Sequence, residues 1–269
     1  MDEPRYLPDS NRLSVLTAVI LLAYALTRII ALPPLAIQTN LLGVNLSFEI
    51  SSSAIVSILV AGLTATGMDW LLRSHPHFHQ KNTIEHWILP ALTAWIIGVS
   101  IDSLADSPFW WLAFLLGGIF LVLICVAEYV AVDPNDSRYG VAVASLTGLS
   151  FVLLLILITA LRTVGMRLIT FLPPLFLAVW LVSMRTLHLR LEGKWEFYWS
   201  LGIAFIVAQL AAPLHYWRLS PLQFGLLMLG PAYALTSFAV NLIEEQPFRR
   251  AITEPLVALV IVWGLSWVS

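Results

Sequence analysis

Nine apolar runs, each long enough to cross a lipid bilayer, constrain this chain more than any other feature of its sequence. A membrane-spanning helix needs about 20 predominantly apolar residues, because the hydrocarbon core is about 30 Å thick and a helix rises about 1.5 Å per residue. The sequence therefore predicts an all-α, polytopic membrane helix bundle that forms a single transmembrane domain over residues 1–269. The last run is short, which leaves the count at eight or nine. The predicted spans are 13–32, 50–68, 86–104, 109–131, 140–161, 168–188, 195–214, 221–241 and 252–268.

Composition agrees with a membrane protein and excludes several other classes. Of the 269 residues, 59% are hydrophobic and 11% are charged, whereas about 25% of a water-soluble domain is charged. The net charge is −2 and no block of lysine or arginine occurs, which excludes nucleic acid as a partner. Cys125 is the single cysteine, so an internal disulfide, a cysteine zinc site and an iron–sulfur cluster are excluded as well.

The distribution of basic residues predicts how the bundle lies in the bilayer. With nine spans, ten Lys and Arg residues fall on the side of the N-terminus and four fall on the other side. Because basic loops stay in the cytoplasm, the N-terminus is predicted to be cytoplasmic. The four residues on the other side are Arg28, Arg162, Arg167 and Arg218. Arg162 and Arg167 depart from the rule, since one short external loop carries both.

Residues 35–49, between the first two spans, lack a helical pattern. Leu46, Phe48 and Ile50 alternate with polar residues, and this period of two predicts an extended segment at the membrane interface. The serines at 51–53 then offer N-caps for the next helix.

The densest polar segment is the predicted cytoplasmic loop between the second and third spans. It contains His75, His77 and His79, and His86 opens the third span. If Pro76 keeps the preceding residue extended, the three loop histidines project to one side. Imidazole nitrogens at this spacing could bind Zn²⁺ or another divalent metal. The alternative is a solvated linker with no metal.

Two further cofactor sites find less support. A membrane haem needs two histidines that face each other at similar depth. His86 and His188 lie at predicted cytoplasmic ends, whereas His215 lies at an external end. Asp102 and Asp106 form an Asp-x-x-x-Asp motif, which could hold Mg²⁺ against a diphosphate.

That motif, the span count and the chain length invite comparison with the intramembrane prenyltransferase family. The family carries two acid-rich motifs on the cytoplasmic side, and the first opens with Asn where this chain has Gly98. Here one such motif occurs, on the predicted external side, and residues 133–136 form a turn sequence instead of a second copy. We therefore interpret Asp102 and Asp106 as part of a short acidic loop.

Prolines interrupt two predicted spans. Residues 173–174 are both proline near the start of the sixth span, and Pro231 lies in the middle of the eighth. A proline inside a helix frees the carbonyl four residues earlier, here that of Leu227, and such breaks often line a cavity in carriers. Polar side chains at comparable depth, which would line this cavity, are Gln209, Tyr233, Thr236 and Ser237.

No charged residue is predicted at the middle of a span. Glu128 and Arg28 lie near helix ends, where their charged groups can reach the interface. Ion-coupled carriers usually keep a charge near the bilayer centre. A carrier built on this chain would therefore move a neutral or lipid-like substrate.

Two stretches carry a resemblance to a known family. They are GMDWLLRSHP at residues 67–76 and YWRLSPLQFG at residues 216–225. Both resemble an uncharacterised family of bacterial multi-pass inner-membrane proteins. The resemblance implies a location in the inner (plasma) membrane and implies no mechanism.

Three functions fit these observations. No recognisable set of catalytic residues occurs in the sequence, so a nonenzymatic function is placed first. The first is a nonenzymatic accessory or binding subunit whose polar cytoplasmic face contacts a membrane or cytoplasmic protein. The second is a carrier or flippase for a neutral or lipid-like substrate. The third is a metal-dependent membrane enzyme that uses the cytoplasmic histidines together with Asp69, Glu85 and Glu128.

Overall fold

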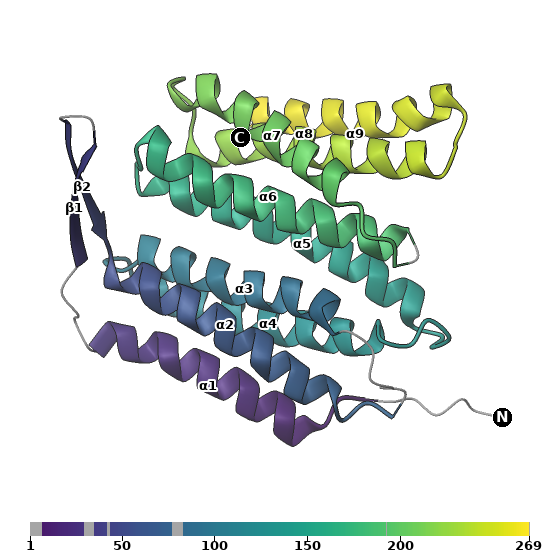
Figure 1. The fold of residues 1–269 in the computed structure, drawn as a ribbon, viewed down its shortest axis with the longest axis horizontal. Helices are drawn as coiled ribbons and strands as arrows, with labels where there is room; N and C mark the ends of the chain where they lie inside the picture. The colour runs from purple at the N-terminus through teal and green to yellow at the C-terminus, as the bar shows by residue number, and fades with distance from the viewer. Residues whose placement is uncertain (1–6, 30–34, 42–43, 77–82, 192, 269) are drawn as a thin grey trace. The chain divides into compact units, whose positions relative to one another are not determined.

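The computed structural model describes residues 7–29, 35–41, 44–76, 83–191 and 193–268, and describes only the backbone of its two strands. Within these residues the chain forms nine α-helices and one two-stranded hairpin (Figure 1). The predicted class, a helical membrane bundle, is confirmed. The helices divide into two compact units. We call Tyr6–Tyr129 the N-terminal unit, and Val130–Ser269 together with Met1–Arg5 the C-terminal unit.

The N-terminal unit contains α1 (Ser10–Ile29), α2 (Ser52–Leu72), α3 (Ile84–Ser103) and α4 (Trp110–Val130). Three of these helices meet at Gly98 of α3. A methyl group at Gly98 would lie 2.1 Å from Oγ of Ser57 on α2 and 2.9 Å from Cε1 of Tyr24 on α1. The hydroxyl of Tyr24 donates a hydrogen bond to the carbonyl oxygen of Ala94 at 2.5 Å. Glycine at position 98 is therefore what lets α1, α2 and α3 approach this closely.

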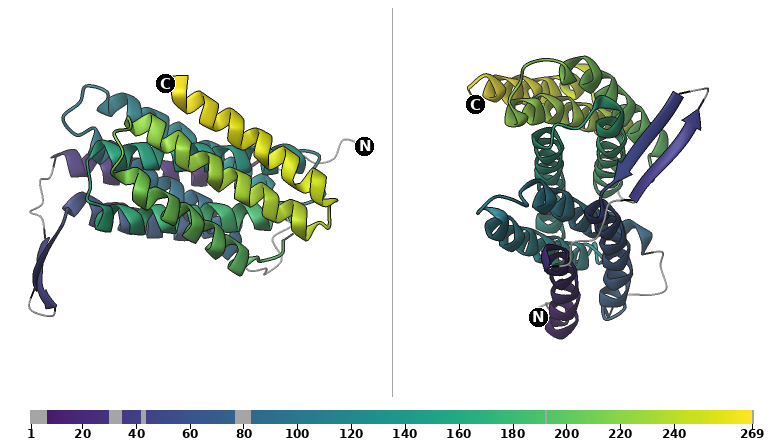
Figure 2. Two further views of the ribbon diagram at one scale, coloured as in Figure 1. Left: turned by 90° about the horizontal axis from the view of Figure 1, so that it is seen from above. Right: turned by 90° about the vertical axis from the view of Figure 1, so that its left-hand side faces the viewer.

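The C-terminal unit contains α5 (Tyr139–Thr163), α6 (Leu168–Arg190), α7 (Phe197–His215), α8 (Pro221–Ile243) and α9 (Phe248–Val268). Helix α8 packs against α5, α7 and α9, and α6 packs against α5 and α7. Figure 2 shows α9, in yellow, lying alongside α8. A capping box starts α8: Oγ of Ser220 accepts from the backbone N–H of Gln223, whose side-chain oxygen accepts from the Ser220 N–H.

The outer faces of the helices are apolar, as a lipid environment requires. Helix α4 exposes a stripe of large side chains at helical spacing, and α9 exposes a similar stripe. The α4 stripe comprises Leu112, Leu115, Leu116, Ile119 and Leu123. The α9 stripe includes Leu256, Val257, Val260, Ile261 and Leu265. In water such faces would be unstable, whereas in a bilayer they contact acyl chains.

Each helix begins and ends within four residues of a predicted span. Among the described helices, the eight from α1 to α8 are long and apolar enough to cross a membrane. Helix α9, with 21 residues, is not one of these eight, so the ninth span stays a prediction. The arrangement of residues 1–269 as a single transmembrane domain also stays a prediction.

The segment between α1 and α2 forms an antiparallel hairpin of β1 (Leu35–Leu41) and β2 (Val44–Ile50). Its register pairs Leu35 with Ile50 and Leu41 with Val44. The predicted extended conformation is confirmed. Ser51 is the N-cap of α2, and its side chain accepts from the backbone N–H of Ala54, which confirms the predicted capping by serine.

Candidate functional site

A buried ion pair joins α3 to α4 in the N-terminal unit. Nδ1 of His86, in the first turn of α3, lies 2.7 Å from Oε2 of Glu128, near the end of α4. Glu128 is fully buried and His86 is also buried. Sequence analysis predicted that the Glu128 carboxylate reaches the interface, and this was wrong. Since a buried carboxylate needs a charged or hydrogen-bonded partner, Glu128 pairs with the imidazole across the helix interface.

A second carboxylate approaches the same imidazole. Oε1 of Glu85 lies 3.3 Å from Nε2 of His86. The imidazole therefore lies between two carboxylates, and only the doubly protonated ring donates to both. Such an arrangement can hold a proton, and its groups are of the kind that bind a divalent metal.

Other predicted site residues lie at the same end of this unit. Oδ1 of Asp69, in the last turn of α2, accepts from the hydroxyl of Thr83 at 2.8 Å, and its Oδ2 pairs with Nε of Arg73 at 2.8 Å. The ring of His75 packs edge-on against Tyr129, with 4.7 Å between centroids. The ends of α2 and α4 and the start of α3 thus gather Asp69, His75, Glu85, His86 and Glu128.

The structure leaves the predicted metal site open. His77 and His79 lie outside the described residues. Among the residues that the structure describes, no three His, Cys, Asp or Glu side chains are placed to hold a metal ion. Zinc binding by His75, His77, His79 and His86 therefore stays a prediction.

The predicted cavity residues lie in different surroundings in the C-terminal unit. Gln209 is exposed on α7, and the ring of Tyr233 packs edge-on against Phe151 of α5 at 5.2 Å. Thr236 is buried and its Oγ1 lies 3.1 Å from Oγ of Ser183 on α6. Ser237 is also buried, and its Oγ has no hydrogen-bond partner among the described residues. A cavity lined by these four stays a prediction.

The carbonyl group that Pro231 leaves unpaired within α8 accepts a hydrogen bond from a side chain of α9. Nε1 of Trp263 donates to the carbonyl oxygen of Leu227 at 3.2 Å, which is the group that Pro231 leaves without an intrahelical donor. Gly230 allows this contact, because a methyl group there would lie 2.9 Å from Cδ1 of Trp263. The site of Pro231 in α8 is therefore a hydrogen-bonded contact between α8 and α9.

Sequence reasoning missed two buried ionisable groups on α6. Arg185 is 1% exposed and His188 is 4% exposed. Arg185 had been counted among the ten basic residues on the side of the N-terminus, and His188 had been placed at a cytoplasmic helix end. Their spacing of three residues within an otherwise apolar stretch places them on neighbouring positions of one helix face, and this signal could have identified them.

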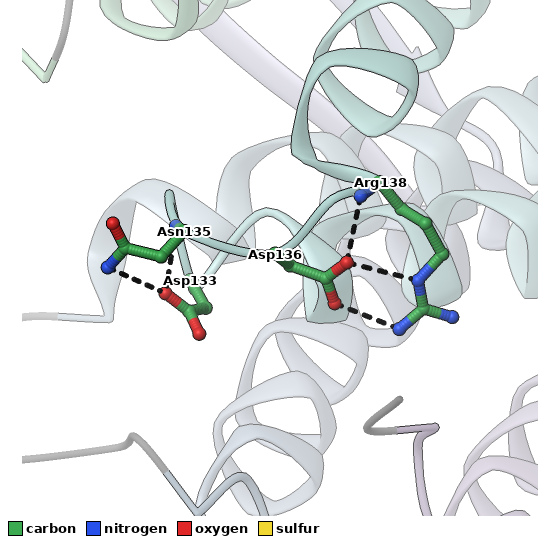
Figure 3. A network of polar contacts seen from close by, with 4 residues as sticks. All are labelled: Asp133, Asn135, Asp136 and Arg138. Carbon is green, nitrogen blue, oxygen red and sulfur yellow. Dashed lines mark hydrogen bonds and ion pairs between the residues drawn. The ribbon is translucent and has the colours of Figure 1, made fainter. Parts of the chain in front are cut away.

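The connection between α4 and α5 is a turn with its own polar network (Figure 3). Oδ1 of Asp133 accepts from the backbone N–H of Asn135 at 3.0 Å. Asp136 accepts from the backbone N–H of Arg138 at 2.8 Å and from its guanidinium at 2.9 and 3.2 Å. This hydrogen bonding raises the pKa of Arg138 above its usual value. The interpretation of residues 133–136 as a turn is confirmed.

Fold and site define a helical bundle of the membrane type, with eight described helices long and apolar enough to cross a membrane and with ionisable groups buried between helices. A family model matches residues 32–269 of the chain, and it is described as "Protein of unknown function (DUF5656)". The chain belongs to this family, which confirms the predicted resemblance to an uncharacterised family. Comparison with curated proteins and with solved structures gave no match.

Proposed function

We propose that this chain is a nonenzymatic accessory or binding subunit of the bacterial inner membrane, with its N-terminus in the cytoplasm. Its partner is a membrane or cytoplasmic protein that contacts the end of the N-terminal unit where α1 begins and α2 ends. The observation that carries this proposal is that polar side chains within the helices bond to other helices of the same unit.

Five such contacts join different pairs of helices. They are Tyr24 to Ala94, His86 to Glu128, Arg162 to His215, Ser183 to Thr236, and Trp263 to Leu227. Polar groups used in this way hold a bundle together, because each bond replaces an unsatisfied group in hydrocarbon. The hydrogen bond between α8 and α9 favours a subunit over a carrier. In a carrier the carbonyl of Leu227 would line the cavity, whereas here it accepts a hydrogen bond from Trp263.

Polar groups that reach solvent lie at the end proposed to bind the partner. The side chain of Arg73 is 66% exposed, and Asp9 and Arg12 form a partly exposed pair at 3.7 Å. Nη1 of Arg12 also donates to the carbonyl oxygen of Trp70 at 2.7 Å, which fixes α1 against α2. Charged groups held on a rigid helix pair suit recognition of a protein surface.

Site-specific photocrosslinking in cells tests this proposal. A photoreactive amino acid replaces Arg73 in one variant and Leu115, on the exposed α4 stripe, in a matched control. We expect a protein adduct of one defined mass from position 73 and lipid adducts from position 115. Lipid adducts alone from both positions would contradict the proposal.

A metal-dependent membrane enzyme is the second candidate. It is supported by the gathering of His75, Glu85, His86 and Glu128 at one end of the N-terminal unit. The His86 ring would bind a metal only after it loses a proton. Metal analysis of the purified protein tests it, beside a variant with His75, His77 and His79 all changed to Ala. His188→Ala on α6 serves as the control. Equal metal content in all three proteins would end this candidate.

A further inference from the structure

A pocket of about 700 Å³ lies between the start of α6 and the end of α7 in the C-terminal unit. Its lining is mixed in character. The apolar part includes Met166, Ile169 and Leu172, and the polar part includes Arg167, His215 and Tyr216. A pocket of this volume accommodates part of an amphiphilic molecule.

Within the C-terminal unit, the segments that surround this pocket are basic and carry no acidic residue. Residues 155–175 and 205–225, which form the α5–α6 and α7–α8 connections and the adjoining helix turns, contain Arg162, Arg167 and Arg218 and lack Asp and Glu. The described acidic residues of the C-terminal unit belong to the opposite helix ends, for example Asp136 before α5 and Glu244 after α8. The pocket is therefore complementary in charge to an anion.

Arg162 fixes the imidazole that forms part of the pocket lining. Its Nη1 donates to the carbonyl oxygen of His215 at 2.8 Å, and its Nη2 donates to that of Trp217 at 3.2 Å. Nη1 also lies 3.3 Å from Nδ1 of His215. Because a guanidinium can only donate, Nδ1 accepts and the proton of the neutral ring is on Nε2. The ring N–H in turn donates to the backbone of Met166, so the imidazole ties the end of α7 to the start of α6 and shapes the pocket.

Arg167 supplies a charged donor to the pocket lining at the start of α6. It is exposed and occupies the N-cap position of α6, where its side chain makes no capping hydrogen bond. Its guanidinium has the planar donor geometry that suits phosphate oxygens. Tyr216 and Trp217 are exposed beside it, as expected for aromatic residues at the level of lipid headgroups.

We propose that this pocket binds an anionic phospholipid, with its phosphate at Arg167 and with an acyl chain along Met166, Ile169 and Leu172. This goes beyond the proposed function and does not depend on it. It gives a reason for two arginines in a loop where the positive-inside rule predicts few. Arg162 caps the end of α7, and Arg167 binds the phosphate of the lipid.

The test compares two lipids that differ in headgroup charge. Delipidated protein in mild detergent is incubated with phosphatidylglycerol and phosphatidylcholine of the same acyl chains, and bound lipid is counted by native mass spectrometry. We expect the native protein to prefer phosphatidylglycerol. Loss of one charge-assisted hydrogen bond weakens binding by about tenfold or more, so Arg167→Gln should lose the preference.

Two control variants distinguish a specific role of Arg167 from a general loss of positive charge. Arg218→Gln removes an exposed charge at the same end of the unit without touching the pocket lining, and should keep the preference. Arg167→Lys keeps the charge and should keep part of the preference. Equal binding of the two lipids by the native protein would overturn the proposal. Displacement of phosphatidylglycerol by excess inorganic phosphate would overturn it too, since the site would then be one for free phosphate.

Discussion

The indole of Trp263 on α9 donates a hydrogen bond to the carbonyl oxygen of Leu227 on α8, at 3.2 Å. That carbonyl lacks an intrahelical donor because Pro231 has no N–H. Trp263 and Leu227 are 36 residues apart in the sequence. The proline and the tryptophan thus act together to hold α8 against α9. The same contact explains why glycine precedes the proline, since a side chain at Gly230 would collide with Trp263.

We predict that Trp263→Phe destabilises the protein by about 1–3 kcal/mol, because the Leu227 carbonyl is left without a donor. Unfolding of the purified protein in detergent, followed by circular dichroism, measures the change. Trp267→Phe is the matched control, since Trp267 is 87% exposed near the end of the same helix. Equal stability of the two variants would show that the hydrogen bond contributes nothing.

Replacement of one member of the buried pair in the N-terminal unit should be costly. Glu128→Leu removes the carboxylate that lies 2.7 Å from the His86 imidazole, and breaking a buried pair in this way costs about 3–5 kcal/mol. The double variant His86→Leu/Glu128→Leu should recover much of that loss, because two apolar side chains fill the same space. The same unfolding assay measures both.

Glu85→Gln provides the comparison for that pair. The Glu85 side chain is 31% exposed and lies 3.3 Å from the imidazole, so its loss should cost about 1 kcal/mol or less.

If the double variant folds as stably as the native protein but loses partner crosslinking, the pair serves function more than stability. Failure of the double variant to recover would contradict the pairing described here.

Gly98 should tolerate no side chain. Gly98→Ala places a methyl group 2.1 Å from Oγ of Ser57 and 2.9 Å from the ring of Tyr24, and overpacking of this kind costs about 1–3 kcal/mol. Gly62→Ala on α2 is the control, because nothing lies within 4 Å of the added methyl. It should be neutral or stabilise the helix by up to about 1 kcal/mol. Similar melting of the two variants would contradict the close helix approach.

Local pattern was enough to predict most of the fold. Apolar runs identified the helices, the serine before α2 identified the start of that helix, and the period of two before Ile50 identified an extended segment. These signals lie within a few residues of one another, so a sequence displays them directly.

Contacts between distant residues could not be predicted in the same way. Glu128 was expected to reach the interface because it lies near a helix end, but its side chain is buried against His86, which is 42 residues away in the sequence. Leu227 was expected to face a cavity because no nearby residue could satisfy its carbonyl. Arg185 was counted among the basic residues on the cytoplasmic side, and it is buried where α6 packs against its neighbours. In each case helix packing decided the environment of the polar group.

Cysteine accessibility in intact cells tests the proposed membrane arrangement most directly. In a Cys125→Ser background, Arg73→Cys probes the end of α2 and Tyr216→Cys probes the end of α7; both native residues are exposed. With the N-terminus in the cytoplasm, a membrane-impermeant maleimide should label position 216 in intact cells and position 73 only after permeabilisation. Labelling of position 73 in intact cells, with position 216 protected, would contradict the arrangement.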